Sequence, residues 1–260
     1  MSARTDTTDR PLRSYRADLH IHTALSPCAS ERMTPPAIVA AATKAQLDII
    51  AISDHNSAGN VAAVQQAAEA AGNNLMVLPG MEITSVEEAH VLGLFPDVAA
   101  ATDAAEELRA LLPPADPDYY AHFGEQPLLE SSGHTLGMET VALSAAASLD
   151  LSETVELIHS RGGLAIAAHI DRKAFGVLSQ LGFFPANAGF DAVEVSRNVP
   201  AGSPRREQYA AHGLPVISSS DSHYPEEVGL AATELRLAGP GFAELSLALA
   251  GAQGRCLAHA

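Results

Sequence analysis

Short apolar runs rich in β-branched residues alternate with alanine-rich segments along most of the chain. The runs at 15–22, 48–55, 75–84, 89–95, 163–170, 190–197 and 214–223 have the length and composition of buried strands. The segments at 34–47, 57–72, 102–113, 151–162, 174–182 and 203–213 carry helical spacing of apolar residues. A last strand, TELRLAG, and a last helix, GFAELSLALAGAQ, follow. Strands that alternate with helices in this way predict a parallel α/β fold.

The domain organisation follows from where this alternation holds and where it stops. No glycine-rich phosphate loop follows the first strand, which favours a barrel over an open dinucleotide-binding sheet. At 114–150 turn residues are frequent and periodicity is weak, so we expect an insertion there. Residues 1–14 are expected to be a flexible tail. The sequence therefore predicts a tail, then one barrel over 15–260 that carries the insertion.

The composition of the chain limits the kinds of molecule that the protein is expected to bind. The 15 basic and 31 acidic residues give a net charge of −16, which repels long phosphate backbones and argues against long duplex nucleic acid as a partner. A small anion can still bind where metal ions or arginines reverse the local potential. Two cysteines are too few for a disulfide framework, so we expect a cytoplasmic protein. No apolar run reaches the roughly 20 residues of a membrane span. The oligomeric state has no signal in the sequence.

Residues with metal-binding side chains stand at the ends of the apolar runs. His20 and His22 close the first run, and residues two apart on a strand face the same side. The same kind of position is held by His55, Glu82, His90, His169, Asp221 and His223. In a parallel barrel the carboxyl ends of the strands meet at one mouth. Any one of these histidines alone would pass as structural, but the repeated position predicts a site for zinc, manganese or iron.

Cys28 lies six residues beyond His22, and two interpretations of it stay open. As a thiolate ligand it would favour zinc or iron over magnesium. As a small apolar side chain it would belong to the core. The turn formed by SPC should bring it back over the mouth.

Four further residues are candidates around the site. Asp18 and Asp54 are placed to orient the metal-binding histidines, although ordinary bonds to the backbone explain them equally well. Arg197 and Arg172 follow strands at the expected mouth, and a guanidinium matches the oxygens of a phosphate. A solvated surface position is the alternative for both, and it is the stronger alternative for Arg172.

The motifs DLHIHT, ISDHN, PGMEIT followed by HVLGLF, AAHI and SSSDSH resemble the successive motifs of the PHP family, named for polymerase and histidinol phosphatase. The resemblance runs from about 15 to 225. It implies a distorted (β/α)7 barrel that holds two or three divalent ions and hydrolyses phosphoesters. It also implies ligand sets: His20, His22, Glu82 and Asp221 for one ion, Glu82, His90 and His169 for a second, and His55 and His223 for a third. Cys28 stands where three-metal relatives often place a histidine or an acidic residue.

The leading hypothesis is a metal-dependent phosphoesterase that hydrolyses a small phosphorylated metabolite, such as a nucleotide or sugar phosphate, with a metal-activated water. One alternative is a 3′-5′ exonuclease or cyclic phosphodiesterase that acts on short nucleic acid or nucleotides. A non-catalytic metal-binding regulatory module is another. A carbon–nitrogen hydrolase on a related barrel often uses a carboxylated lysine, but Lys44 and Lys173 are not at evident strand ends.

Overall fold

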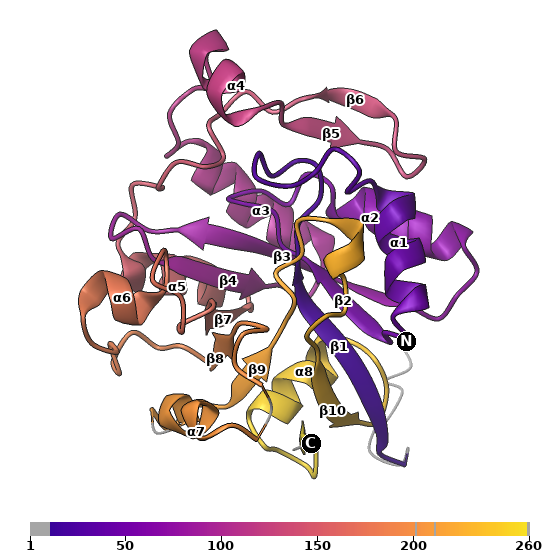
Figure 1. Ribbon diagram of the computed structural model, residues 1–260, viewed down its shortest axis with the longest axis vertical. Coiled ribbons are helices and arrows are strands. Elements are labelled where there is room, and N and C mark those ends of the chain that lie inside the picture. The colour runs from indigo at the N-terminus through magenta and orange to yellow at the C-terminus, as the bar shows by residue number, and fades with distance from the viewer. Residues whose placement is uncertain (1–10, 201, 211, 259–260) are drawn as a thin grey trace, which may run out of the picture.

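The computed structural model describes residues 11–200, 202–210 and 212–258. Nine strands form one sheet in the order β11-β10-β1-β2-β3-β4-β7-β8-β9. Their bounds are β1 (Arg13–Ile21), β2 (Ile49–Ile52), β3 (Met76–Thr84), β4 (His90–Leu94), β7 (Leu164–Ala167), β8 (Ala192–Val195), β9 (Val216–Ser218), β10 (Thr233–Leu237) and β11 (Cys256–Leu257). The sheet curls into a nearly closed barrel surrounded by helices (Figure 1), which confirms the expected fold class.

The helices and the strands share two apolar cores. The helices around the barrel are α1 (Pro35–Lys44), α2 (Val61–Ala70), α3 (Val98–Arg109), α5 (Leu151–Ser160), α6 (Val177–Leu181), α7 (Pro204–Ala210) and α8 (Phe242–Leu249). Ile49 and Ala51 of β2 pack inside the barrel with Leu245 of α8, whereas Ile50 and Ile52 belong to the larger core that includes the outer helices. Burying each large side chain contributes about 1.5–3 kcal/mol. The strict alternation along β2 fixes which face of that strand points inward.

The sheet is mixed, so the expectation of a parallel fold is wrong for part of it. β4 runs antiparallel to both β3 and β7, and β10 runs antiparallel to β1. The connection between β3 and β4 spans only residues 85–89, which is too short for the crossover that parallel neighbours require. As a result the start of β4, at His90, lies at the same end of the barrel as the carboxyl ends of the parallel strands.

The two regions expected to be irregular each contain regular structure. Residues 1–10 lie outside the described residues, and Arg13 and Ser14, which we placed in the tail, pair with β10. The region 114–150 holds α4 (Pro117–Phe123) and a hairpin of β5 (Pro127–Leu129) and β6 (Thr135–Met138), at the top of Figure 1. The Asn60 side chain bonds to the backbone of Pro127 and Leu129. The segment therefore packs on the loop that follows β2.

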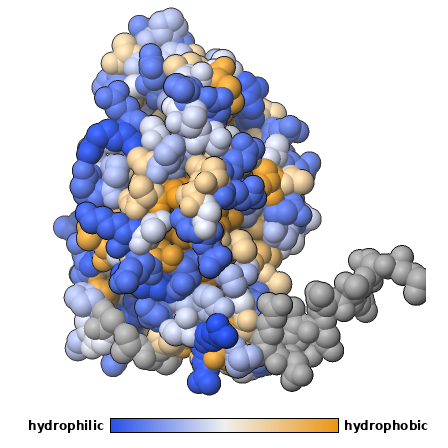
Figure 2. Space-filling model, turned by 90° about the vertical axis from the view of Figure 1, so that its right-hand side faces the viewer, coloured by the Kyte–Doolittle hydropathy of each residue, from blue (hydrophilic) through white to orange (hydrophobic). Residues whose placement is uncertain are grey.

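The outer surface is varied in character. Seen from the side of α1 and α2, it carries many hydrophilic residues around smaller apolar patches (Figure 2). A hollow between these two helices is lined in part by Val39 and Ala67. Across the described ranges, the helices are all too short or too polar to cross a membrane.

Candidate metal centre

Five histidines surround one carboxylate at the mouth of the barrel, and a sixth packs against them. Glu82, in the second half of β3, is almost fully buried. Its carboxylate oxygens lie 2.8–3.4 Å from ring nitrogens of five histidines, which are His20, His22, His55, His90 and His169. The sixth, His223, stacks on the ring of His22, with centroids 4.4 Å apart. Segments from the whole length of the chain therefore meet at Glu82.

Three overlapping groups of side chains have the geometry of a metal site. Within each group, one ligand atom from every residue lies within 4.8 Å of the others. The groups are His20, His22, Glu82 and Asp221, then His55, Glu82 and His90, then His22, His55 and His223. The first group matches the set expected for one ion. The other two differ from the expected sets. His55 takes the place of His169 beside Glu82 and His90, so that His169 is in none of the three groups, and His22 joins His55 and His223.

Unpaired ring nitrogens provide a direct test of whether this cluster suits cations. Nε2 of His20, Nδ1 of His55 and Nδ1 of His169 are buried and form no hydrogen bond with a described residue, although the first two lie 3.4 and 3.2 Å from oxygens of Glu82. Buried polar atoms without partners are rare and costly in proteins. Imidazole nitrogens and carboxylate oxygens together are the donors that zinc, manganese and iron accept. The residues present therefore fit divalent cations.

Electrostatics divide the histidines into two kinds. Burial opposes the charged form of His20 and His22, but nearby carboxylates outweigh it. They raise the pKa of His22 to about 9, and they raise the pKa of His20 well above its usual value. Burial lowers the pKa of His55 well below its usual value. Burial and the charge of His22 lower the pKa of His223 to about 4. Without cations, the raised pKa values favour the protonated form of His20 and His22 near pH 7, and the lowered values favour the neutral form of His55 and His223.

Backbone geometry at two of these residues is strained. His169, just after β7, has φ +26°, and Asp221, just after β9, has φ +49°. Both values lie at positive φ, which non-glycine residues seldom adopt. Such outliers concentrate at functional sites, where the surrounding structure holds them in place. Both side chains lie in the cluster, where Nε2 of His169 is 2.9 Å from Glu82 and Oδ1 of Asp221 is 3.1 Å from Nε2 of His22.

Glu194 orients the cluster from inside the barrel, and the sequence interpretation missed it. This fully buried residue of β8 lies with both carboxylate oxygens 3.1 Å from Nδ1 of His20. It also accepts the backbone N–H of His169 at 3.1 Å. The bond at Nδ1 leaves Nε2 of His20 facing Glu82 and Asp221. A carboxylate within the apolar run DAVEV was the signal that could have found it.

Asp54 and Asp18 support the site in different ways. Asp54 accepts bonds from Thr23 and from the hydroxyl of Ser26, and the Ser26 Oγ lies 2.9 Å from Nδ1 of His22. Asp54 therefore acts on His22 through one serine. Asp18 instead accepts bonds from Ser220 and from the backbone of Gly229. Asp18 thus fixes the segment before Asp221 rather than a histidine ring. An irregular register between β1 and β2 from Asp18 to Ile21 explains the different directions of Asp18 and His20.

Cys28 lies at the outer edge of the cluster. Its Sγ is 3.1 Å from Nε2 of His223, although the residue is exposed and belongs to none of the three groups. Desolvation of the thiol, followed by the nearby carboxylates of Glu82 and Asp221, raises the pKa of Cys28 to about 12. The placement over the mouth agrees with the expected turn, and the core interpretation does not fit an exposed residue.

The two arginines lie at different depths. Nη1 of Arg172 is 2.5 Å from Oδ2 of Asp221, so Arg172 reaches into the site. Arg197 pairs with Glu227 at 2.8 Å, and Glu227 in turn accepts the backbone N–H of His223. Arg172, which we considered the more probable surface residue, is therefore the closer of the two to the cluster.

Four of the five remaining histidines have their contacts outside the cluster. His134 pairs with Glu130 on the exposed hairpin, and His159 pairs with Asp191. His212 stacks on Phe184. His122 packs on Phe123 in α4, and His259 lies outside the described residues.

The comparisons with known proteins agree with this fold and site. The family model described as PHP domain matches residues 18–175, and the one described as PHP-associated matches 206–252. Fold and cluster together define a class of barrel protein whose strand ends carry histidines and carboxylates that suit divalent cations. Since the first match covers more than half of its length, the chain belongs to the PHP family.

Particular relatives resemble parts of the chain. The 5′-3′ exoribonuclease Rnm of Salmonella typhimurium is 33% identical over 85 residues, which cover 32% of this chain and 28% of that enzyme. The match therefore spans less than a third of the relative. Endonuclease Q from Pyrococcus furiosus shares the fold, with a TM-score of 0.65 and 18% identity over 94% of this chain and 58% of its own. A protein from Bifidobacterium adolescentis described as a metal-dependent phosphoesterase has a TM-score of 0.56 and 23% identity, over 81% and 88% of the two chains.

Proposed function

We propose that this chain hydrolyses phosphoesters with the help of divalent cations held by the cluster around Glu82. The substrate would be a small phosphorylated molecule or a chain that carries a terminal phosphate. The observation that carries the proposal is the set of three overlapping ligand groups beside an arginine. One cation would be held by His20, His22, Glu82 and Asp221, a second by His55, Glu82 and His90 with His169 on the same carboxylate, and a third by His22, His55 and His223 beside Cys28. Glu82 belongs to the first two groups, so its two carboxylate oxygens could serve two ions in one centre. A neutral imidazole has one free lone pair, so His22 and His55 would each serve one ion at a time.

The protein's own side chains would fix the geometry of the reaction. Bound cations supply positive charge for phosphoryl oxygens and lower the pKa of a water. Glu194 and Ser26 hold the Nδ1 atoms of His20 and His22, so that Nε2 of each ring faces the centre. Arg172 reaches the same centre from the loop after β7, where its guanidinium can donate two bonds to a phosphate. Arg197 lies further out and would contact a larger substrate.

A substrate panel tests the proposal. Protein loaded with manganese, zinc or iron should release phosphate from a sugar phosphate, a mononucleotide or a phosphorylated oligonucleotide, and EDTA should stop the release. A chromogenic phosphodiester in the same panel separates diesterase from monoesterase activity. If fully loaded protein turns over none of these phosphoesters, the proposal is wrong, and a metal-binding regulatory module becomes the better account.

A second candidate, hydrolysis of nucleotides or nucleic-acid ends, is favoured by an aromatic ring at the edge of the cluster. The ring of Phe175 stacks on that of His90, with centroids 4.4 Å apart and planes 11° apart, and the residue is 41% exposed. Its φ of +60° is unusual for a bulky residue, and its carbonyl accepts the backbone N–H of His90 at 2.9 Å. Aromatic side chains bind nucleobases by stacking, at about 1–3 kcal/mol per base. The Rnm relative, a 5′-3′ exoribonuclease, supports the same candidate with a direction opposite to the one we expected.

Replacing Phe175 with leucine is expected to lower kcat/KM by about tenfold for a mononucleotide and to change it less than about twofold for ribose 5-phosphate, because only the nucleotide has a base to stack. Phe175→Trp should retain the wild-type preference. Phe183→Leu is the matched control. Phe183 is 62% exposed, and the phenylalanines that contact a histidine ring in the described part of the chain are Phe123, Phe175 and Phe184. Equal losses on both substrates would mean that the ring supports His90 rather than a base.

We expected the protein not to bind long duplex nucleic acid, and the only ground for this is its net charge of −16. One endonuclease Q structure with this fold, at a TM-score of 0.68, contains a 27-mer duplex with an abasic lesion. The fold therefore does not by itself exclude a duplex. Comparing the rate on an oligonucleotide with the rate on the same strand in a duplex, at low and high salt, decides the question.

A further inference from the structure

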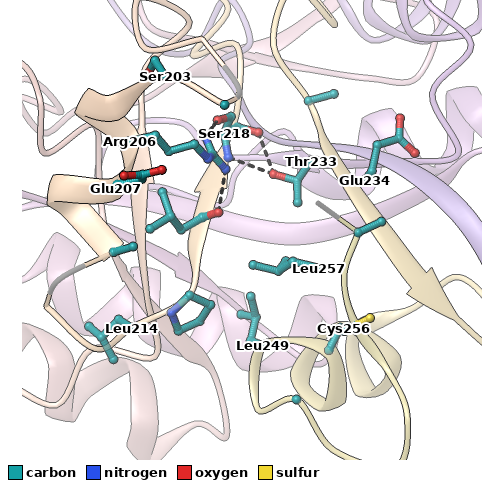
Figure 3. A pocket seen from close by; sticks show the side chains of 18 residues that line it. Ser203, Arg206, Glu207, Leu214, Ser218, Thr233, Glu234, Leu249, Cys256 and Leu257 are labelled. Carbon is teal, nitrogen blue, oxygen red and sulfur yellow. Dashed lines mark hydrogen bonds between the residues drawn. The ribbon is translucent and has the colours of Figure 1, made fainter. Parts of the chain in front are cut away.

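The barrel has an open seam on the side away from the histidine cluster. The end of β1 bonds to the segment after β9, with the backbone N–H of His22 donating to the Ser222 carbonyl at 3.0 Å. The first half of β1 pairs instead with β10, from Arg13 to Ala17. β9 and β10 therefore part below the mouth. The wedge between them, bounded by α7, α8 and β11, is a cavity of about 560 Å³ (Figure 3), within the range of small-molecule sites.

The walls of this cavity are mainly aliphatic. Leu214, Leu249 and Leu257 lie around the cavity in Figure 3, and Val216 of β9 also lines it. No aromatic side chain is among the described residues that line it. Such walls suit an aliphatic chain better than a sugar or a nucleobase. None of the cluster residues lines the cavity, so a ligand here would not occupy the metal centre.

One cation stands at the edge of these apolar walls. The guanidinium of half-buried Arg206 donates to the hydroxyl of Ser218 at 2.5 Å and to the carbonyl of Val216 at 2.7 Å. Within the described part of the chain it forms no ion pair, and burial alone lowers its pKa. The hydroxyl of Ser203, which also lines the cavity, is buried without a described partner. Two of the five N–H groups of the guanidinium are used, so a carboxylate can take others.

The acidic groups nearby limit the charge of a ligand. Glu207 and Glu234 both line the cavity. Glu234 is bonded to Ser14 and lies 3.9 Å from Arg16, and Glu207 is exposed. Two carboxylates at the rim would repel a phosphate or other polyanion more strongly than a single carboxylate.

We propose that this cavity binds an aliphatic monocarboxylate, with its carboxylate on Arg206 and its chain along the leucine and valine walls. An uncharged molecule of the same length would bury the same apolar surface but leave Arg206 without a counter-charge. A short carboxylate would pair with Arg206 but leave the apolar walls uncovered. Affinity should therefore require both the charge and the chain.

Isothermal titration calorimetry of the full-length protein with octanoate, 1-octanol and acetate tests this proposal. We expect one octanoate per chain, with 1-octanol and acetate each at least tenfold weaker. Arg206→Gln, which can still donate a bond toward Ser218, should weaken octanoate at least tenfold and leave 1-octanol unchanged. Arg205→Gln is the matched control, because Arg205 is the exposed neighbour on α7.

Several results would overturn the proposal. These are no binding of octanoate at millimolar concentration by folded protein, equal affinity for octanoate and 1-octanol, or octanoate binding that Arg206→Gln leaves unchanged. If Arg206→Gln does not fold, the three-ligand comparison on the wild-type protein decides the question. Metal content and phosphoester hydrolysis do not enter the test, so its result is independent of the proposed function.

Discussion

Replacing Glu82 with glutamine is expected to remove at least one bound cation per chain and to slow phosphoester hydrolysis by at least about 100-fold. Loss of a group that only orients a metal ligand already lowers metal affinity or activity by about 10–100-fold, and Glu82 would be a ligand itself. Glu82 belongs to two of the three ligand groups and lies within 3.4 Å of five histidine rings. Glutamine keeps the shape and removes the charge. Metal content is measured by mass spectrometry after desalting, and the rate is measured on the best substrate of the panel.

Two further variants grade this result. Glu194→Gln should weaken metal binding by about 10–100-fold without abolishing it, because Glu194 contacts His20 and not the centre itself. Glu107→Gln is the control, since Glu107 pairs with Arg161 on the exposed side of α3. Circular dichroism checks that each variant is folded. Unchanged metal content in folded Glu82→Gln would show that the Glu82 carboxylate is not a metal ligand, and the two ligand groups that contain it would then be wrong.

The sequence predicted the position of a site residue best where that position follows from the residue's own strand. The metal-binding side chains stand where apolar runs end, and strands that converge on one mouth bring those ends together whatever the details of each strand. His90 shows the limit of that rule. It begins its strand, and it reaches the mouth because β4 is antiparallel, which only the short 85–89 connection indicates.

Features that depend on packing between distant segments could not be predicted. Glu194 is bonded to His20, which lies 174 positions away in the chain, and the sequence around Glu194 does not indicate this partner. Asp18 was expected to orient a metal-binding histidine, but the register of β1 is irregular from Asp18 to Ile21, and Asp18 bonds to Ser220 instead. The seam that forms the Arg206 cavity exists because the first half of β1 pairs with β10 and its end pairs with the segment after β9. The order of strands along the sequence does not reveal this pairing.

Metal affinity is expected to rise by at least about tenfold for each pH unit between pH 6 and 8. Each proton that a bound cation displaces makes the association constant rise about tenfold per pH unit. Carboxylates raise the pKa of His22 to about 9, so in the metal-free protein this ring is protonated throughout the window and must lose its proton to become a ligand. His223, with a pKa of about 4, is already neutral there and adds no dependence. Competition with a chelator at several pH values measures the slope.

Calorimetry at pH 7 in two buffers with different ionisation enthalpies counts the protons directly. At least about one proton per chain should be released when the cations bind, and a second should follow from His20, whose pKa is also raised. Circular dichroism at each pH excludes acid unfolding as the cause of weak binding. A flat affinity from pH 6 to 8 with no proton release would mean that the cations do not replace the protons of His20 and His22. The ligand groups that contain these histidines would then be wrong, whereas His55, Glu82 and His90 would stay as the site.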